Sequence, residues 1–264
     1  MCELLGLCFN KEVNTRISFN EFKLHSEGNP DGWGLGFYPD RAVRIFKEPI
    51  TAKTSRLVEF IREYEEIRSK IFISHIRLTS GTKVCYRNTH PFCRELGGKQ
   101  YVFAHNGTLG WYKKKDGLEL GDYRTVGETD SEWAFCWLME QLKNRFGTEK
   151  DSTKKWSHDD FDWLHEKFLY INEFGNFNCL MSEGVHLFSY YDKRGYNSLL
   201  YLIRKKPFGS IRLLDDDFQI NLRDEKDPDE QGVIIATRPL TDENWVSFKP
   251  GQLIVVENGR ILFN

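Results

Sequence analysis

The pattern of apolar and polar positions predicts strands in both halves of the chain. Ten short runs are rich in β-branched and aromatic residues and are bounded by turn residues, as strands are. The last run contains Asn258-Gly259, a dipeptide that favours a two-residue hairpin turn. The predicted strands cover residues 2–9, 32–38, 42–47, 70–77, 101–107, 178–184, 185–192, 198–204, 232–240 and 252–263.

Apolar residues spaced three or four apart predict three helices, over residues 54–70, 131–147 and 157–175. For the first helix, Thr54 is a candidate N-cap, and the expected apolar stripe consists of Leu57, Ile61 and Tyr64.

The last predicted helix carries the clearest start signal. Ser157 is followed three residues later by Asp160, which is a capping-box pattern. The polar segments 148–156 and 223–231 are expected to be exposed loops. Strands, then two helices, then strands again indicate an α+β fold in one domain, with sheets covered by helices.

Composition and charge narrow the classes of protein that fit. The 264 residues are 40% hydrophobic and 29% charged, with a net charge of -2, so no nucleic-acid or membrane partner is favoured. No window approaches the ~20 apolar residues of a membrane span. Six scattered cysteines without a C-x-x-C pair favour a reducing cytoplasm. His90 and Cys93 have no second ligand pair nearby, so neither a metal nor a cofactor is expected.

The chain begins Met1-Cys2, which places a thiol where removal of Met1 would leave it with a free α-amine. That amine has an ordinary pKa of ~7.7–8.0 and can serve the neighbouring thiol as a base. Methionine aminopeptidase tolerates a small second residue, so Met1 is expected to be removed. The alternative is that Cys2 is an ordinary small residue of the core.

Three further positions carry functional groups, each with a simpler interpretation beside it. Arg77 ends a strand and can grip a carboxylate with two donors, or it is a solvated charge. Asn106 and Gly107 offer two neutral donors suited to an oxyanion, or they form a tight turn. Asp130 precedes a helix as a carboxylate for a substrate ammonium, or it is an N-cap.

Together these groups match one kind of substrate. A fixed cation and a fixed anion recognise an α-amino acid head group, and a thiol with two oxyanion donors cleaves an acyl bond further along the molecule. Glutamine has the required α-carboxylate, α-ammonium and scissile γ-amide.

Seven motifs in order along the chain resemble the class II glutamine amidotransferases, which are N-terminal-nucleophile hydrolases, and in particular their stand-alone YafJ-like branch. The motifs span almost the whole sequence and are MCELLG, DGWGLGFY, SHIRLTSG, NTHPF, FAHNGTL, GETDSE and ATRPLTDENW.

The resemblance implies a four-layer αββα sandwich formed by a single domain, residues 1–264. It also implies a role for each candidate residue. Cys2 matches the nucleophile, with its own amine as base, and Asn106 and Gly107 match the oxyanion hole. Arg77 matches the residue that binds the substrate carboxylate, and Asp130 the residue that holds the α-ammonium.

Known members of the family carry a second domain that consumes the ammonia, and this protein is expected to lack one. Three activities therefore remain open: hydrolysis of glutamine alone, supply of ammonia to a separate enzyme, or cleavage of another γ-glutamyl compound such as a peptide. A rival hypothesis of another class is a regulatory module that binds glutamine without turnover.

Overall fold

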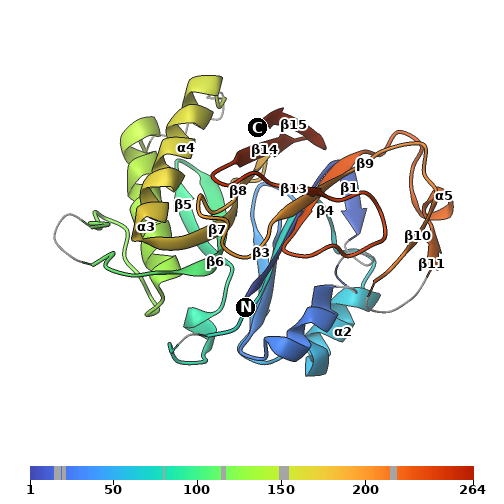
Figure 1. The fold of residues 1–264 in the computed structure, drawn as a ribbon, viewed down its shortest axis with the longest axis horizontal. Helices are drawn as coiled ribbons and strands as arrows, with labels where there is room; N and C mark the ends of the chain where they lie inside the picture. Colours follow the sequence, from blue (N-terminus) through green and yellow to red (C-terminus); the bar gives the residue numbers. More distant parts are fainter. Residues whose placement is uncertain (15–18, 20–21, 80, 114–116, 149–154, 215–218) are drawn as a thin grey trace.

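Two antiparallel sheets form the middle of the molecule (Figure 1). The structure is a computed structural model, and it describes residues 1–14, 19, 22–79, 81–113, 117–148, 155–214 and 219–264. Over these residues the larger sheet has the strand order β13 (Val246–Ser247), β9 (Leu200–Arg204), β12 (Gly232–Ala236), β1 (Glu3–Asn14), β4 (Arg68–Ile76), β2 (Trp33–Phe37) and β3 (Arg44–Glu48). The smaller sheet has the order β15 (Arg260–Phe263), β14 (Leu253–Glu257), β8 (His186–Tyr190), β7 (Gly175–Ser182), β6 (Lys99–Leu109) and β5 (Phe92–Leu96).

Helices lie on the outer faces of the two sheets (Figure 1). The helices α3 (Asp130–Phe146) and α4 (His158–Ile171) cover the smaller sheet, and α2 (Arg56–Glu63) lies against the larger one. The remaining elements are short: η1 (His25–Gly28), η2 (Ala52–Thr54), η3 (Tyr86–Asn88), η4 (Asn172–Phe174), α5 (Leu222–Glu225) and the hairpin of β10 (Ser210–Arg212) with β11 (Gln219–Asn221).

Three apolar clusters hold these layers together. The central cluster lies between the sheets and draws on β1, β4, β6, β7 and β14, through residues such as Leu4, Ile73, Ala104, Leu180 and Ile254. A second cluster fills the space between the smaller sheet and α3 and α4, and a third lies between the larger sheet and α2. The predicted α+β fold and its αββα layering are therefore confirmed.

Local signals in the sequence account for several elements. The Ser157 side chain accepts a hydrogen bond from the Asp160 N–H, and the Asp160 carboxylate accepts one from the Ser157 N–H, so the predicted capping box is present. Asn258 and Gly259 have φ values of 47° and 71° and join β14 to β15, as expected for the hairpin.

The first predicted helix was wrong in its bounds, and its apolar stripe was right only in part, since Ile61 is buried and Leu57 packs against the core but Tyr64 does not. Ser55, not Thr54, is the N-cap of α2, because its side chain accepts a hydrogen bond from the Val58 N–H. The helix ends at Glu63, so Tyr64 lies outside it and is 44% exposed. Val58 and Ile61 are the residues that it buries.

Loop predictions had mixed outcomes. The stretch 223–231 is not wholly loop, because its beginning belongs to α5. Of the other predicted loop, 148–156, residues 149–154 lie outside the described part. The short strand β5 was not predicted, because its sequence FCREL mixes charged with apolar residues.

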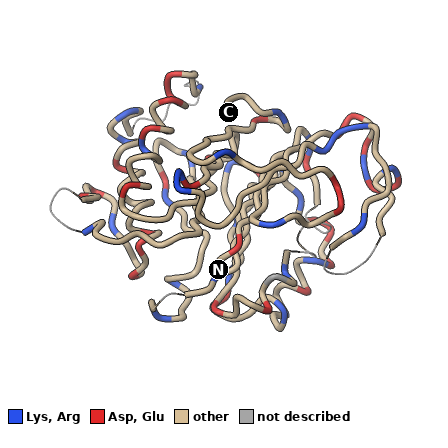
Figure 2. Tube along the Cα trace, in the orientation of Figure 1, with Lys and Arg blue, Asp and Glu red and all other residues tan. Residues whose placement is uncertain are grey.

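Acidic and basic residues are intermingled along the trace and do not gather on one side (Figure 2). Among the described residues, no helix is long and apolar enough to cross a membrane.

Candidate active site

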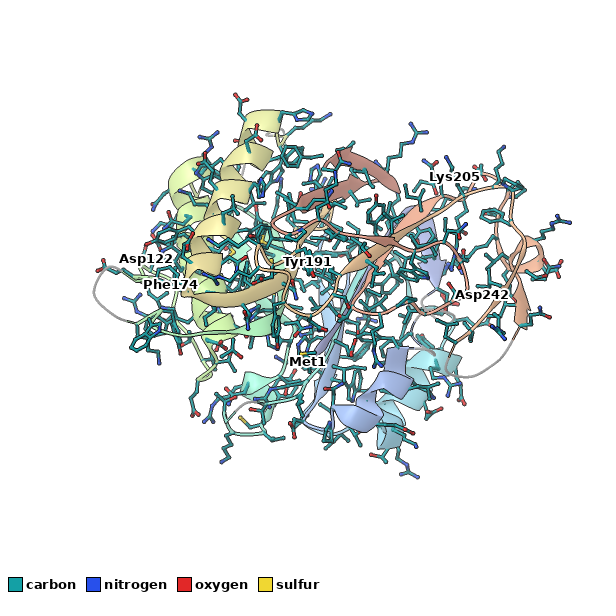
Figure 3. All side chains as sticks on the ribbon, viewed as in Figure 1. Met1, Asp122, Phe174, Tyr191, Lys205 and Asp242 are labelled. Carbon is teal, nitrogen blue, oxygen red and sulfur yellow. The ribbon has the colours of Figure 1, made fainter. Side chains whose placement is uncertain are left out.

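The Cys2 thiol lies at the start of β1, where the chain enters the larger sheet. Its Sγ is 3.2 Å from both the N–H and the carbonyl oxygen of Leu78, in the segment that follows β4. The antiparallel pairing of β1 with β4 causes this contact, because Glu3 lies opposite Ile76 and the residues before Glu3 therefore meet those after Ile76. Figure 3 shows Met1 a little below the centre of the view, between the part with α3 and α4 and the part with α2.

The surroundings of Cys2 do not by themselves produce a thiolate. Burial raises the pKa of the Cys2 thiol, and the Leu78 N–H, the terminal ammonium of Met1 and the Arg77 guanidinium offset only part of this effect. Among the described residues, both hydrogen-bond partners of Sγ are backbone groups of Leu78. A nucleophilic Cys2 therefore needs a base that the side chains around it do not supply.

Arg77 is a buried cation at the end of β4, 3% exposed. Its guanidinium donates to the Asp31 carbonyl at 3.3 Å and to the Thr82 hydroxyl at 2.7 Å. In the described part of the chain no carboxylate lies within ion-pair distance of it, and burial lowers its pKa. Burying an unpaired charge is costly, so this arginine is suited to an anionic ligand.

Asp31 fixes the segment that contacts Cys2. Its carboxylate accepts a hydrogen bond from the Thr79 N–H at 2.8 Å, and its own N–H donates to the Arg77 carbonyl at 3.1 Å. The backbone on both sides of Leu78 is thus held by one residue of the loop before β2.

Asn106 and Gly107 approach Cys2 from the opposite sheet, on β6. Asn106 is 1% exposed, and its Nδ2 donates to the Cys2 carbonyl oxygen at 2.7 Å. An amide nitrogen has two protons, so a second one remains for another acceptor. Gly107 follows it, and a β-carbon there would overlap the backbone carbonyl of Asn176 on β7, so only glycine fits this position.

Asp130 is the first residue of α3, and Thr129 before it is the N-cap. Asp130 Oδ2 accepts a hydrogen bond from the Leu109 N–H at 2.6 Å, which ties the helix start to the end of β6. Because Thr129 is the N-cap, the alternative interpretation of Asp130 as an N-cap is wrong. Among the described residues, no cation forms an ion pair with the Asp130 carboxylate.

His105 lies on the other face of β6 from Asn106, as strand alternation predicts. Its Nδ1 is 2.9 Å from the Ser131 hydroxyl, and its Nε2 lies 3.1 Å from the Asn176 carbonyl. It is a buried link between β6, β7 and α3.

Sequence reasoning missed one segment beside the site, residues 192–197. Asp192 accepts hydrogen bonds from the N–H groups of Arg194 and Tyr196, and Asn178 Nδ2 donates to the Tyr196 carbonyl at 2.9 Å. Burial is the main cause that raises the pKa of the Tyr196 hydroxyl. The negative charge of a Cys2 thiolate raises this pKa further, which indicates that Tyr196 lies near the thiol. No local motif marks this turn.

Comparison with known proteins decides the family. The family model described as "Glutamine amidotransferases class-II" matches residues 1–264.

The chain belongs to the class II glutamine amidotransferases.

Two curated relatives of this class II amidotransferase cover nearly all of it. It is 49% identical to an uncharacterized protein of Methanocaldococcus jannaschii, over 100% of this chain and 71% of that one. It is 36% identical to YafJ of Escherichia coli, over 96% of each chain.

Solved structures agree with this family. The crystal structure of a predicted glutamine amidotransferase from Pseudomonas aeruginosa matches with a TM-score of 0.73 and 33% identity, over 100% of both chains. The glutamine phosphoribosylpyrophosphate amidotransferase of B. subtilis shares the fold at a TM-score of 0.52 and 15% identity, over 98% of this chain and 48% of that one.

Contacts in this class II amidotransferase link the predicted site residues. Cys2 touches Asn106 directly and touches the backbone next to Arg77 through Leu78. Asp130 joins the group through Leu109, two residues after Gly107. The site thus draws on β1, β4, β6 and the start of α3, at one end of the sandwich.

Proposed function

We propose that the protein hydrolyses a γ-glutamyl amide through a thioester on Cys2, as a single domain of residues 1–264 from which Met1 is removed. The free α-amine of Cys2 then takes the thiol proton, which the raised pKa of the thiol makes necessary. The sulfur attacks the γ-carbonyl carbon, and the tetrahedral oxyanion accepts hydrogen bonds from Asn106 Nδ2 and the Gly107 N–H.

The remaining steps release the products. The ammonium form of the Cys2 amine gives its proton to the leaving nitrogen, and the carbon–nitrogen bond breaks. Water then attacks the γ-glutamyl thioester, which yields glutamate and restores the thiol. With glutamine as substrate the leaving group is ammonia, which is released or passed to a separate enzyme.

One observation carries this proposal. Arg77 is a buried cation without a carboxylate partner among the described residues, and it lies one residue before Leu78, whose backbone groups contact the Cys2 sulfur. A cation for a substrate carboxylate is thus next to the proposed nucleophile. Asp130, an anion with neutral hydrogen-bond partners, is suited to the α-ammonium of the same substrate.

The test is glutamate release from L-glutamine by protein whose intact mass shows that Met1 is absent. We expect turnover by the wild type and none by Cys2→Ala. Glutamine binding without turnover by the processed wild type would instead favour the regulatory-module hypothesis. Absence of both would contradict the proposal.

A further inference from the structure

The turn of residues 192–197, between β8 and β9, lies beside the proposed nucleophile. Asn178 on β7 is paired with Asn106 on β6, and Asn106 donates to the Cys2 carbonyl oxygen at 2.7 Å. Asn178 Nδ2 in turn donates to the Tyr196 carbonyl oxygen at 2.9 Å. Two asparagines that lie opposite each other in one sheet thus hold the nucleophile and this turn.

Buried groups fix the shape of the turn. The Asp192 side chain is fully buried, and its own N–H donates to Asn178 Oδ1 at 2.8 Å. Its carboxylate accepts hydrogen bonds from backbone and side-chain N–H groups, those of Arg194, Tyr196, Phe177 and Asn172. A carboxylate is tolerated in the interior when such bonds satisfy it, so this network determines how the turn runs.

The backbone on both sides of Tyr196 has a special conformation. Gly195 before it and Asn197 after it have φ values of 74° and 56°, in the left-handed region. A residue other than glycine is uncommon there, and such residues are frequent at functional sites. The Tyr191 hydroxyl donates to the Asn197 carbonyl oxygen at 3.0 Å. The backbone of Tyr196 is therefore held in place from both sides.

The Tyr196 hydroxyl lies near the thiol and is free. In the described part of the chain it makes no hydrogen bond, whereas the hydroxyls of Tyr38 and Tyr190 do. Burial raises the pKa of the Tyr196 hydroxyl, and the charge of a Cys2 thiolate raises it further, as expected for a group near the sulfur. Because both partners of the sulfur are backbone groups of Leu78, the Tyr196 hydroxyl remains available to a substrate atom.

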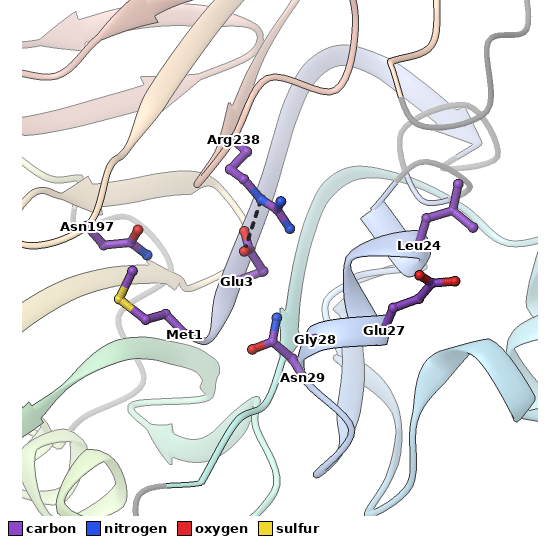
Figure 4. Close-up of a pocket in the computed structure, with 8 residues that line it drawn as sticks. All are labelled: Met1, Glu3, Leu24, Glu27, Gly28, Asn29, Asn197 and Arg238. Carbon is purple, nitrogen blue, oxygen red and sulfur yellow. Dashed lines mark ion pairs between the residues drawn. The ribbon is translucent and has the colours of Figure 1, made fainter.

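The turn also lies on the amine side of Cys2. Met1 is bonded to the Cys2 nitrogen and therefore marks the direction of that nitrogen. Met1 and Asn197 line one cavity, and the Asn197 side chain points toward Met1 (Figure 4). In the proposed function, on which this inference rests, the Cys2 nitrogen protonates the leaving nitrogen. The leaving nitrogen therefore lies on the same side of Cys2 as the turn.

The other polar atoms of the substrate already have partners in the proposed site. Arg77 binds the α-carboxylate and Asp130 the α-ammonium, while Asn106 and Gly107 bind the oxyanion. The scissile nitrogen is the atom that remains. A hydroxyl both donates and accepts hydrogen bonds, so the same group can accept one from the amide N–H and later one from the attacking water.

We propose that Tyr196 is a further catalytic residue, whose hydroxyl binds the leaving nitrogen of the substrate and then the water that replaces it. In the first step a C–S bond to Cys2 forms, the γ-glutamyl C–N bond breaks, and the nitrogen takes the proton that the Cys2 amine received from the thiol. In the second step water forms a C–O bond, the C–S bond breaks, and a water proton passes through the amine to the sulfur. Tyr196 orients both molecules and neither gains nor loses a proton overall.

Tyr196→Phe, which removes only the hydroxyl, tests this role in protein whose intact mass shows that Met1 is absent. We expect kcat for L-glutamine to fall about tenfold or more, with KM within about twofold, because the lost hydrogen bond is made to the reacting atoms. A diazo-ketone analogue of norleucine alkylates the thiol with release of dinitrogen and no amide nitrogen, so its rate should stay within about threefold of that of the wild type. The midpoint of urea denaturation should not change, because the hydroxyl has no partner among the described residues.

Tyr64→Phe, at an exposed tyrosine that follows α2, is the matched control and should leave all these measurements unchanged. Equal kcat values for Tyr196→Phe and the control, when the wild type releases glutamate, overturn the role of Tyr196 alone. A fall in kcat that is matched by slower alkylation or by a lower urea midpoint shows a structural role and also overturns it. Absence of glutamate release by the processed wild type contradicts the proposed function and, with it, this inference.

Discussion

The Asn106 side chain on β6 donates a 2.7 Å hydrogen bond to the carbonyl oxygen of Cys2, and this bond joins the two sheets at the end where the first strand begins. The residue with the thiol and the residue proposed to stabilise the oxyanion are thus held together by a single contact. Several consequences for activity and stability can be measured.

Arg77→Lys should lower kcat/KM for glutamine. Lysine keeps the charge but loses the planar fork that grips a carboxylate, so we expect a fall of about a hundredfold, chiefly in KM. Steady-state kinetics of the processed protein measure this. Arg87→Lys, at an exposed arginine paired with Glu128, is the control, and an Arg77→Lys protein within threefold of it would argue against the assigned role.

Asp31→Ala should lower kcat/KM about tenfold, because the Thr79 N–H then loses its charged acceptor and the segment that contacts Cys2 is less fixed. The matched control is Asp40→Ala, since Asp40 also accepts a backbone N–H, from Ala42, on an exposed turn. Equal effects of the two substitutions would show that Asp31 does not position the site.

Gly107→Ala should destabilise the protein by about 1–3 kcal/mol and abolish activity, because the new methyl group overlaps the Asn176 carbonyl. Urea denaturation measures the stability. Gly209→Ala places its methyl group in open space and is expected to leave the unfolding midpoint nearly unchanged. A Gly107→Ala protein as stable and active as the control would contradict this packing.

His75 should make the protein less stable in acid. Burial lowers its pKa to about 3, against ~6.5 when unfolded, so below pH 6.5 the unfolded chain takes up a proton that the folded protein does not. Its stability contribution is complete above pH 6.5 and declines as the pH falls toward 3. At pH 5 the loss is about 2 kcal/mol.

Urea denaturation at pH 7.5 and pH 5 tests this statement about His75. His75→Gln should reduce the difference between the two pH values by about 2 kcal/mol. His158→Gln, at an exposed histidine, serves as the control. If the wild type and His75→Gln lose the same stability between these pH values, His75 is not the source of the acid sensitivity.

Features that depend on neighbouring residues could be predicted from the sequence. The capping box of Ser157 and Asp160 and the hairpin at Asn258-Gly259 are local, so short stretches of sequence determine them. The same reasoning placed the start of α2 one residue too early, because Thr54 and Ser55 are both good caps and tertiary packing selects between them.

Long-range contacts of the site could not be predicted in this way. The bond from Thr79 to Asp31 and the support of the 192–197 turn by Asn178 join segments that only the folded sheets bring together. The pair of Glu3 with Arg238 likewise depends on the register of β1 with β12, across more than 200 residues of sequence. Candidate residues could be named from motifs, but the groups that hold them could not.

The role of Cys2 as nucleophile is tested by the mass of the protein after reaction with a diazo-ketone analogue of norleucine, an electrophile that resembles glutamine. We expect a chain without Met1 that carries one adduct, and peptide mapping should place this adduct on Cys2. Prior saturation by glutamine should prevent the adduct. A Met1-free chain without an adduct, or with the adduct on Cys85 or Cys93 instead, would contradict the proposal that Cys2 is the nucleophile of a glutamine-binding site.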